Sequence, residues 1–209
     1  LSMVLGPDGR VMAEAGEGEE AQVVALPVDD LQRVRSRFCS VGEYPFPGDD
    51  RDKIVTRAEL SGRLQSIRRQ GSRVAFTNGC FDILHSGHVA YLEEARRTAD
   101  CLVVGLNSDA SVRALKGEGR PVNREEDRAR VLAALGCVDF VVVFGEEAPL
   151  DLIRTILPDV LVKGADWPEE QIVGGSEVKA AGGRVVRIAF AHDVSTTRVI
   201  SRIQACREG

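Results

Sequence analysis

Cysteines are few in this sequence and form no recognisable framework. The 209 residues include five, an odd number, widely spaced and set mostly in apolar runs without any Cys-x-x-Cys pair. This pattern excludes a disulfide-stapled scaffold and a zinc ribbon, and it indicates small packing residues in a reducing compartment. No protein-held metal site is predicted. The five cysteines are Cys39, Cys80, Cys101, Cys137 and Cys206.

Long apolar runs and an excess of positive charge are also missing. No stretch approaches the roughly 20 apolar residues that span a bilayer, and the N-terminus lacks the basic-then-apolar layout of a signal peptide. A formal net charge of -5 argues against a nucleic-acid-binding surface, which needs a basic face. We therefore expect a cytoplasmic protein that binds neither membranes nor nucleic acid. Any phosphate binding must be local.

What the sequence does contain is an alternation of strand and helix patterns over residues 53–209. With 44% hydrophobic residues the chain can bury a core, and repeated βα units predict a Rossmann-like α/β domain with a doubly wound parallel sheet. Ligands of such sheets bind beyond the carboxyl ends of the strands. Residues 1–52 are expected to form a short appendage and linker. Strands are expected at 73–76, 101–106, 138–144, 160–162 and 185–190, and helices near 57–70, 109–115, 124–135, 150–157, 177–181 and 196–206. A further helix is expected to start near His85 and to carry Val89, Leu92 and Ala95 on its inward face.

Two helix starts are marked by capping patterns. Thr56 and Glu59 have the spacing of a capping box, and Asn123, with Glu126 three residues on, is expected to cap a later helix. Apolar residues at helical spacing then predict the buried faces. These are Leu60, Leu64 and Ile67 in the first helix, and Val131, Leu132 and Leu135 in the later one.

The most informative stretch runs from Thr77 to His88 and places two of the three histidines one helical turn apart. Residues 73–76 indicate a buried strand, Asn78-Gly79 a turn, and the residues from 86 onward a helix. His85 and His88 should therefore project from a strand-to-helix turn. A helix N-terminus offers unpaired N–H groups and partial positive charge, so the pair indicates an anion site with catalytic side chains. Plain surface histidines are the alternative, but they leave the nearby glycines without a use.

Two polar loops are expected to face the same edge of the sheet. Asn107 and Asp109 follow the second strand, where the ligand crevice should lie. Residues 114–122 form a glycine-rich basic loop, in which Lys116 and Arg120 suit a flexible cover over an anion. An ordinary solvated surface loop is the alternative.

Arg128 stands in the expected first turn of the next helix. A positive charge there opposes the helix dipole, which indicates that the side chain points at a ligand. A helix-surface salt bridge with Glu125 or Asp127 is the alternative.

Two late segments add further candidates. Trp167 follows a strand end and Lys163, and it either stacks on a base or sugar or packs on its own loop. Residues 195–197 offer three hydroxyls before the last helix, where they would cap the helix, bind phosphate, or do both.

Five segments together carry a resemblance to a known family. Residues 76–88, which end in His-x-Gly-His, resemble the signature of the cytidylyltransferase-like nucleotidyltransferases. With residues 105–109, 120–123, 162–166 and 195–197, the chain from about 53 to 203 is most similar to the branch that adenylylates D-glycero-β-D-manno-heptose 1-phosphate. The resemblance implies transfer of the adenylyl group of ATP to a heptose 1-phosphate, giving ADP-heptose and pyrophosphate for lipopolysaccharide core or surface glycan synthesis. It also implies Mg²⁺ bound with ATP and a separate sugar kinase in the pathway, and it allows a homodimer.

The resemblance also implies roles for individual residues. Asp82 is interpreted as a loop organiser, because a phosphate nucleophile needs no deprotonation. The implied catalytic residues are His85, His88, Lys116 and Arg128. The implied nucleotide contacts are Asn78, Gly79, Phe81, Asp82, Gly87, Lys163, Gly164, Asp166, Ser195, Thr196 and Thr197, and the implied contacts to the second substrate are Asn107, Asp109, Arg120 and Trp167.

Two other functions stay open. One is a cytidylyltransferase for a small alcohol phosphate such as glycerol 3-phosphate, since the shared motifs specify chemistry and not substrate. The other is a nucleotide-binding module without turnover.

The first 50 residues require a separate interpretation. A hairpin is expected from residues 3–5 and 10–13, a strand at 22–26, and a short helix from Asp29 with Leu31, Val34 and Phe38 on one face. Residues 1–47 resemble the closing segment of the carbon-nitrogen hydrolases but match none of their catalytic positions. The first residue, Leu1, suggests a fragment, so an amidase in a longer parent chain is a further alternative.

Overall fold

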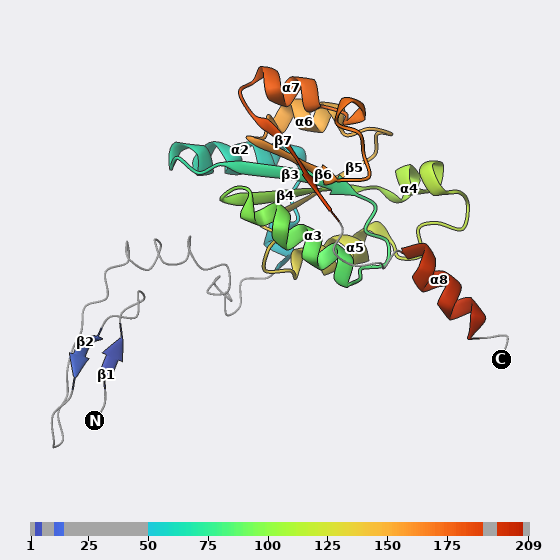
Figure 1. Ribbon diagram of the computed structural model, residues 1–209, viewed down its shortest axis with the longest axis horizontal. Coiled ribbons are helices and arrows are strands. Elements are labelled where there is room, and N and C mark those ends of the chain that lie inside the picture. Colours follow the sequence, from blue (N-terminus) through green and yellow to red (C-terminus); the bar gives the residue numbers. More distant parts are fainter. Residues whose placement is uncertain (1–2, 6–10, 15–49, 190–195, 207–209) are drawn as a thin grey trace. The chain divides into compact units, whose positions relative to one another are not determined.

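The computed structural model describes residues 3–5, 11–14, 50–189 and 196–206, and the chain divides into two compact units, 1–47 and 48–209 (Figure 1). In the first unit, β1 (Met3–Leu5) pairs antiparallel with β2 (Val11–Glu14), as the hairpin prediction requires. The strand expected at 22–26 and the helix expected from Asp29 lie outside the described residues.

The second unit is built on a parallel sheet of five strands in the order β5-β4-β3-β6-β7. The order runs outward in two directions from the centre, so the switch point lies between β3 and β6. This confirms the doubly wound α/β fold expected from the alternating pattern. The strands are β3 (Val74–Gly79), β4 (Cys101–Asn107), β5 (Phe140–Phe144), β6 (Val160–Gly164) and β7 (Arg184–Ile188).

Helices cover both faces of this sheet. Figure 1 shows α3 and α5 on one side, and α2, α6 and α7 on the other. The core is divided accordingly: Ala75 packs with Leu92 and Leu132 on the first side, whereas its neighbour Phe76 packs with Leu64 and Ile153 on the second. Successive side chains of β3 point to opposite faces of the sheet and thus contribute to both cores. The helices are α2 (Arg57–Arg69), α3 (Ser86–Arg97), α4 (Asp109–Lys116), α5 (Glu125–Ala133), α6 (Leu150–Ile156), α7 (Gly175–Ala180) and α8 (Thr196–Ala205), with short 3-10 turns η2 (Asp50–Lys53) and η3 (Glu169–Gln171).

The start of α2 follows the sequence prediction. The Thr56 hydroxyl accepts a hydrogen bond from the Glu59 N–H at 3.3 Å, and the Glu59 carboxylate accepts one from the Thr56 N–H at 2.8 Å. Leu60 and Leu64 are buried on this helix. The capping box is therefore confirmed.

The expected turn at Asn78-Gly79 is wrong. Both residues complete β3, where they pair with Gly105 and Leu106 of β4. The chain turns two residues later, at Phe81, whose φ of 42° is left-handed. The ladder with β4 holds Asn78-Gly79 extended and so overrides the local turn preference.

The expected cap of α5 is wrong, and so is one residue of its expected apolar face. Asn123 does not cap this helix: its side-chain amide donates to the Asp82 carbonyl and its N–H to the Asp82 carboxylate, and the N-cap is Arg124, which makes no side-chain capping bond. Leu132 is buried and Leu135 packs against the core, as predicted, but Val131 is 48% exposed, and Ala129 and Ala133 are buried on the helix. Within the described ranges, no helix is both long and apolar enough to cross a membrane.

Candidate active site

A cavity of about 450 Å³ lies at the carboxyl ends of β3, β4 and β6, beside the switch point of the sheet. Its volume is in the usual range for small-molecule sites, and its place is the one that the fold favours for ligands. It brings together many of the residues singled out in the sequence. Those lining it are Asn78, Gly79, Phe81, Asp82, His88, Asn107, Lys116, Lys163, Gly164, Asp166, Trp167 and Thr196.

The two histidines stand at the start of α3, as predicted. His85 is the N-cap residue, and its carbonyl accepts the His88 N–H at 2.9 Å. Their rings stack with centroids 3.8 Å apart, and the Phe81 ring packs against His88 edge-on at 5.3 Å. The Nδ1 atoms of both imidazoles are buried and have no hydrogen-bond partner among the described residues. Of the two histidines, His88 lines the cavity and His85 does not.

Burial keeps this pair uncharged. Desolvation, assisted by the neighbouring His85 and Lys116 charges, lowers the pKa of His88 from 6.5 to about 4. Burial also lowers the pKa of His85. At neutral pH each ring is therefore a neutral imidazole with one N–H donor.

Lys163 reaches the cavity from the end of β6. Its Nζ donates a hydrogen bond to the Asn78 side-chain oxygen on neighbouring β3. Burial lowers its pKa from 10.5 to about 8, because the ammonium has lost hydration and no carboxylate of the described residues pairs with it. Such a group is poised to bind an anion.

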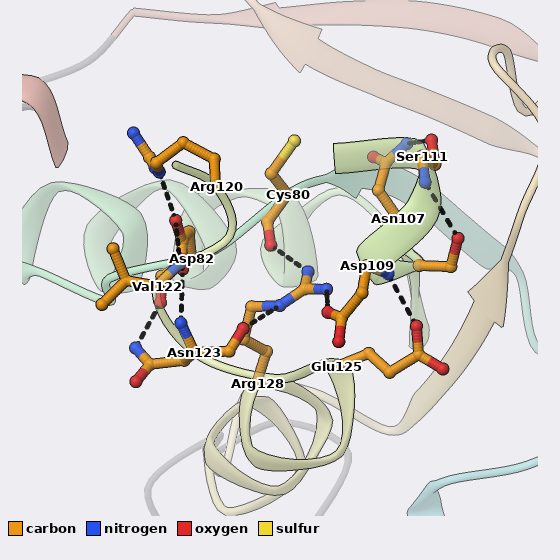
Figure 2. Close-up of polar contacts among 11 residues, drawn as sticks. Cys80, Asp82, Asn107, Asp109, Ser111, Arg120, Val122, Asn123, Glu125 and Arg128 are labelled. Carbon is orange, nitrogen blue, oxygen red and sulfur yellow. Dashed lines mark hydrogen bonds and ion pairs between the residues drawn. The ribbon is translucent and has the colours of Figure 1, made fainter. Parts of the chain in front are cut away.

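The Asp82 carboxylate is fully buried and fixes the loop that follows α4 (Figure 2). It accepts hydrogen bonds from Arg120 Nε at 2.6 Å, from the Val122 N–H at 2.8 Å and from the Asn123 N–H at 3.0 Å. Burial alone would raise the pKa of Asp82, but the Asn123, Val122 and Arg120 donors lower it below 3.8. These are the contacts of a loop organiser, as the sequence predicted.

Arg128 is also buried, and Figure 2 shows its guanidinium surrounded by acceptors. Nε donates to the Asn123 carbonyl at 3.0 Å, Nη1 to the Cys80 carbonyl at 2.6 Å, and Nη2 to the Asp109 carboxylate at 2.7 Å. The alternative of a salt bridge with Glu125 or Asp127 is therefore wrong, because the ion-pair partner of Arg128 is Asp109. Glu125 instead accepts the Asp109 N–H at 2.7 Å, at the start of α4.

Several predicted residues do not line the cavity. His85, Gly87, Asp109, Arg120, Arg128 and Thr197 are described but lie outside its lining, and Ser195 is outside the described residues. Arg120 and Arg128 are engaged by Asp82 and Asp109, which sequence spacing could not reveal.

Other lining residues were not predicted. Tyr91 follows His88 by three positions, so helical spacing could have found it, and its hydroxyl bonds that of Thr77 at 2.8 Å. Leu115, Glu147 and Pro149 also line the cavity. Glu147 and Pro149 follow the end of β5, the same kind of position that identified Asn107.

Comparison with known proteins is consistent with this arrangement. Residues 76–202 match the cytidylyltransferase-like family. The chain is similar to proteins named "Bifunctional protein HldE". It is 55% identical to the protein of Methylobacillus flagellatus over 152 residues, and the match covers 73% of this chain and 31% of that protein. In Gluconacetobacter diazotrophicus the identity is 57% over 152 residues, again 73% and 31%. In Wolinella succinogenes it is 52% over 183 residues, 86% and 38%. The chain thus spans about a third of the length of these relatives.

Two solved structures share the fold. The lipopolysaccharide core biosynthesis protein of Thermoplasma volcanium is 27% identical with a TM-score of 0.50, covering 59% of this chain and all 100% of that one. Pantothenate synthetase of Thermus thermophilus is 20% identical with a TM-score of 0.52, covering 73% and 70%. At 20% identity the second likeness concerns the fold alone.

Proposed function

Because the chain belongs to the cytidylyltransferase-like family, we propose that it transfers the adenylyl group of ATP to a heptose 1-phosphate, producing ADP-heptose and pyrophosphate. The observation that carries this proposal is the pair of stacked, uncharged imidazoles at the start of α3, beside a cavity that Lys116 and Lys163 also line. Donors and cations gathered on one cavity suit a triphosphate. The likeness to the lipopolysaccharide core biosynthesis protein of Thermoplasma volcanium supports a place in surface glycan synthesis.

The reaction needs orientation and charge stabilisation more than covalent chemistry. A phosphate oxygen of the acceptor attacks the α-phosphorus of ATP in line, the bond from that phosphorus to the bridging oxygen breaks, and pyrophosphate leaves with the electron pair. His88 donates a hydrogen bond to the phosphate oxygens as their charge rises, and His85 holds its ring by stacking. Lys116 and Lys163 neutralise phosphate charge from opposite sides of β3. No proton transfer to the protein is required.

The binding of the two substrates follows from the same cavity. Trp167, which is 52% exposed at its edge, offers an aromatic face to the base or sugar, and Thr196 offers a hydroxyl to phosphate. Asn107, the last residue of β4, also lines the cavity, and we place the acceptor beside it.

Mg²⁺ belongs to the proposal as the partner of the triphosphate, whose charge it would partly neutralise. The described residues contain no group of three or more His, Cys, Asp or Glu that could hold a metal. They fit an ion carried by phosphate oxygens and water, with the Asp166 and Glu147 carboxylates facing the same cavity. A sugar kinase would supply the acceptor.

The test is pyrophosphate release with Mg²⁺, using ATP or CTP in turn with heptose 1-phosphate or glycerol 3-phosphate. We expect release only when a nucleotide and an acceptor are both present, and fastest with ATP and heptose 1-phosphate. A wrong base leaves pocket donors and acceptors unpaired, which costs several kcal/mol. Faster release from CTP with glycerol 3-phosphate would replace the substrate assignment. Nucleotide binding without any release would refute the enzyme.

A further inference from the structure

Lys116 lies on a segment that is fastened at both ends to the turn between β3 and α3. At one end Asp109, the first residue of α4, is paired with Arg128, which also donates to the Cys80 carbonyl in that turn. At the other end, the Val122 and Asn123 N–H groups donate to Asp82, two residues after Cys80. Residues 109–123 therefore form an arch with two feet: Val122 and Asn123 bond Asp82 directly, whereas Asp109 is linked to Cys80 through Arg128 (Figure 2).

Arg128 is closed off from a substrate by its burial. Its side chain is 1% exposed, and Nε, Nη1 and Nη2 each donate to a protein acceptor at 3.0 Å or less. Two of its five N–H donors stay unused among the described residues, but a phosphate could reach them only by opening this buried cluster, and breaking a buried ion pair is costly because it leaves a charge unpaired. The contacts of Arg128 are therefore structural.

Lys116 is in the opposite situation. It is exposed at the last position of α4 and lines the cavity, and within the described part of the chain it makes no hydrogen bond or ion pair. The next residue, Gly117, has a φ of 95°, so the helix ends there. The position of the Lys116 ammonium relative to His88 therefore depends on how α4 and residues 117–123 are held. The buried Val112 side chain fixes the body of α4, and the two feet of the arch hold its start and the segment that follows it.

We propose that Arg128 and Asp82 are positioning residues that hold the arch, and through it Lys116, over the cavity that His88 lines. Arg128 acts on the reaction without touching either substrate. The kinetic part of this inference rests on the proposed function, whereas the structural part does not.

Hydrogen exchange tests the structural part without any substrate. In Arg128→Lys and Asp82→Asn, amide exchange over residues 109–123 should accelerate by tenfold or more, most at Val122 and Asn123, while the amides of β4 stay protected. Arg113→Ala is the matched control, because this exposed arginine lies on the same arch between its feet. Unchanged exchange across the arch in both variants would overturn the proposal, even if the protein released no pyrophosphate at all.

A double-mutant cycle tests the kinetic part. If Arg128 acts through Lys116, Arg128→Lys should lower kcat/KM by about a hundredfold in the natural chain but by less than about threefold when Lys116 is already alanine. If Arg128 bound phosphate itself, the two losses would multiply, and that result would overturn the positioning role. Absence of activity in the unchanged protein would instead refute the proposed function. The hydrogen-exchange result alone would then show whether Arg128 and Asp82 hold residues 109–123 in place.

Discussion

Replacing Lys163 by methionine is expected to stabilise the protein while it lowers activity. The folded state holds the ammonium in a poorly hydrated place, where its pKa falls from 10.5 to about 8. That difference corresponds to a penalty of about 3 kcal/mol at neutral pH. Methionine has a similar length and no charge, but it leaves the Asn78 side-chain oxygen without its donor, which costs about 1 to 2 kcal/mol. The balance is a gain of about 1 to 2 kcal/mol, or roughly 2 to 8 °C in Tm.

The pH dependence of stability tests whether desolvation of Lys163 is the cause of this gain. Because the folded pKa is below the unfolded one, the unfolded chain binds more protons between about pH 8 and 10.5, and the stability of the natural protein should rise with pH across that window. Below pH 8 the penalty is constant. The Tm advantage of Lys163→Met, followed by circular dichroism, should therefore be full at pH 7 and shrink towards pH 10. Lys116→Met, at an exposed position, is the control and should leave Tm unchanged.

The outcome that refutes this reasoning is a lower Tm for Lys163→Met at pH 7. It would mean that the Asn78 contact outweighs desolvation. Pyrophosphate release should fall in the same variant, since the cavity loses a cation.

Three other predictions concern the site and the domain. His88→Ala should lower turnover by about a hundredfold, as for other preorganised donors, with folding nearly unchanged; near-normal pyrophosphate release would remove the imidazole from the mechanism. Asp82 has a lowered pKa, so its contribution to stability is present above pH 3.8 and is lost as the pH falls through its folded value; urea midpoints between pH 5 and 2 should fall less steeply for Asp82→Asn, and parallel curves would contradict this. A chain starting at Gly48 should fold and keep its activity, because that unit has its own core; insoluble expression would argue otherwise.

Local sequence patterns predicted the parts of the fold that depend on near neighbours. Residues 101–106 form the fully buried strand β4, and the apolar part of the run predicted at 138–144 forms the edge strand β5, which begins at Phe140, after Asp139. The capping box at Thr56 needs only residues three apart, and the helix after His85 follows from apolar residues at helical spacing, such as Leu92 and Ala95. These signals hold because the interactions behind them are short in sequence.

The predictions from sequence are wrong where a residue bonds a partner that is distant along the chain. Asn123 has the right residue type and spacing for a cap. Its N–H and its side-chain amide instead donate hydrogen bonds to Asp82, 41 residues earlier. Arg128 reaches back 48 residues to the Cys80 carbonyl, and Asn78-Gly79 remains extended because β4 pairs with it. A window of ten or fifteen residues contains none of these partners. The candidate residues could therefore be found from the sequence, but the division between those that face the cavity and those that support it could not.

The stacked histidines at the start of α3 have a consequence for how the protein exchanges protons with its surroundings. Each imidazole is neutral alone, and a polyanion bound beside it must make it more basic. By reciprocity, protonation of the pair must tighten polyanion binding by the same factor. Nucleotide binding should therefore draw protons from the solution, so its measured heat should change with the ionisation enthalpy of the buffer, and binding should strengthen as the medium is acidified toward the pKa of His88, about 4. Without a ligand the two imidazoles are uncharged, and the bound polyanion raises their pKa so that they take up protons.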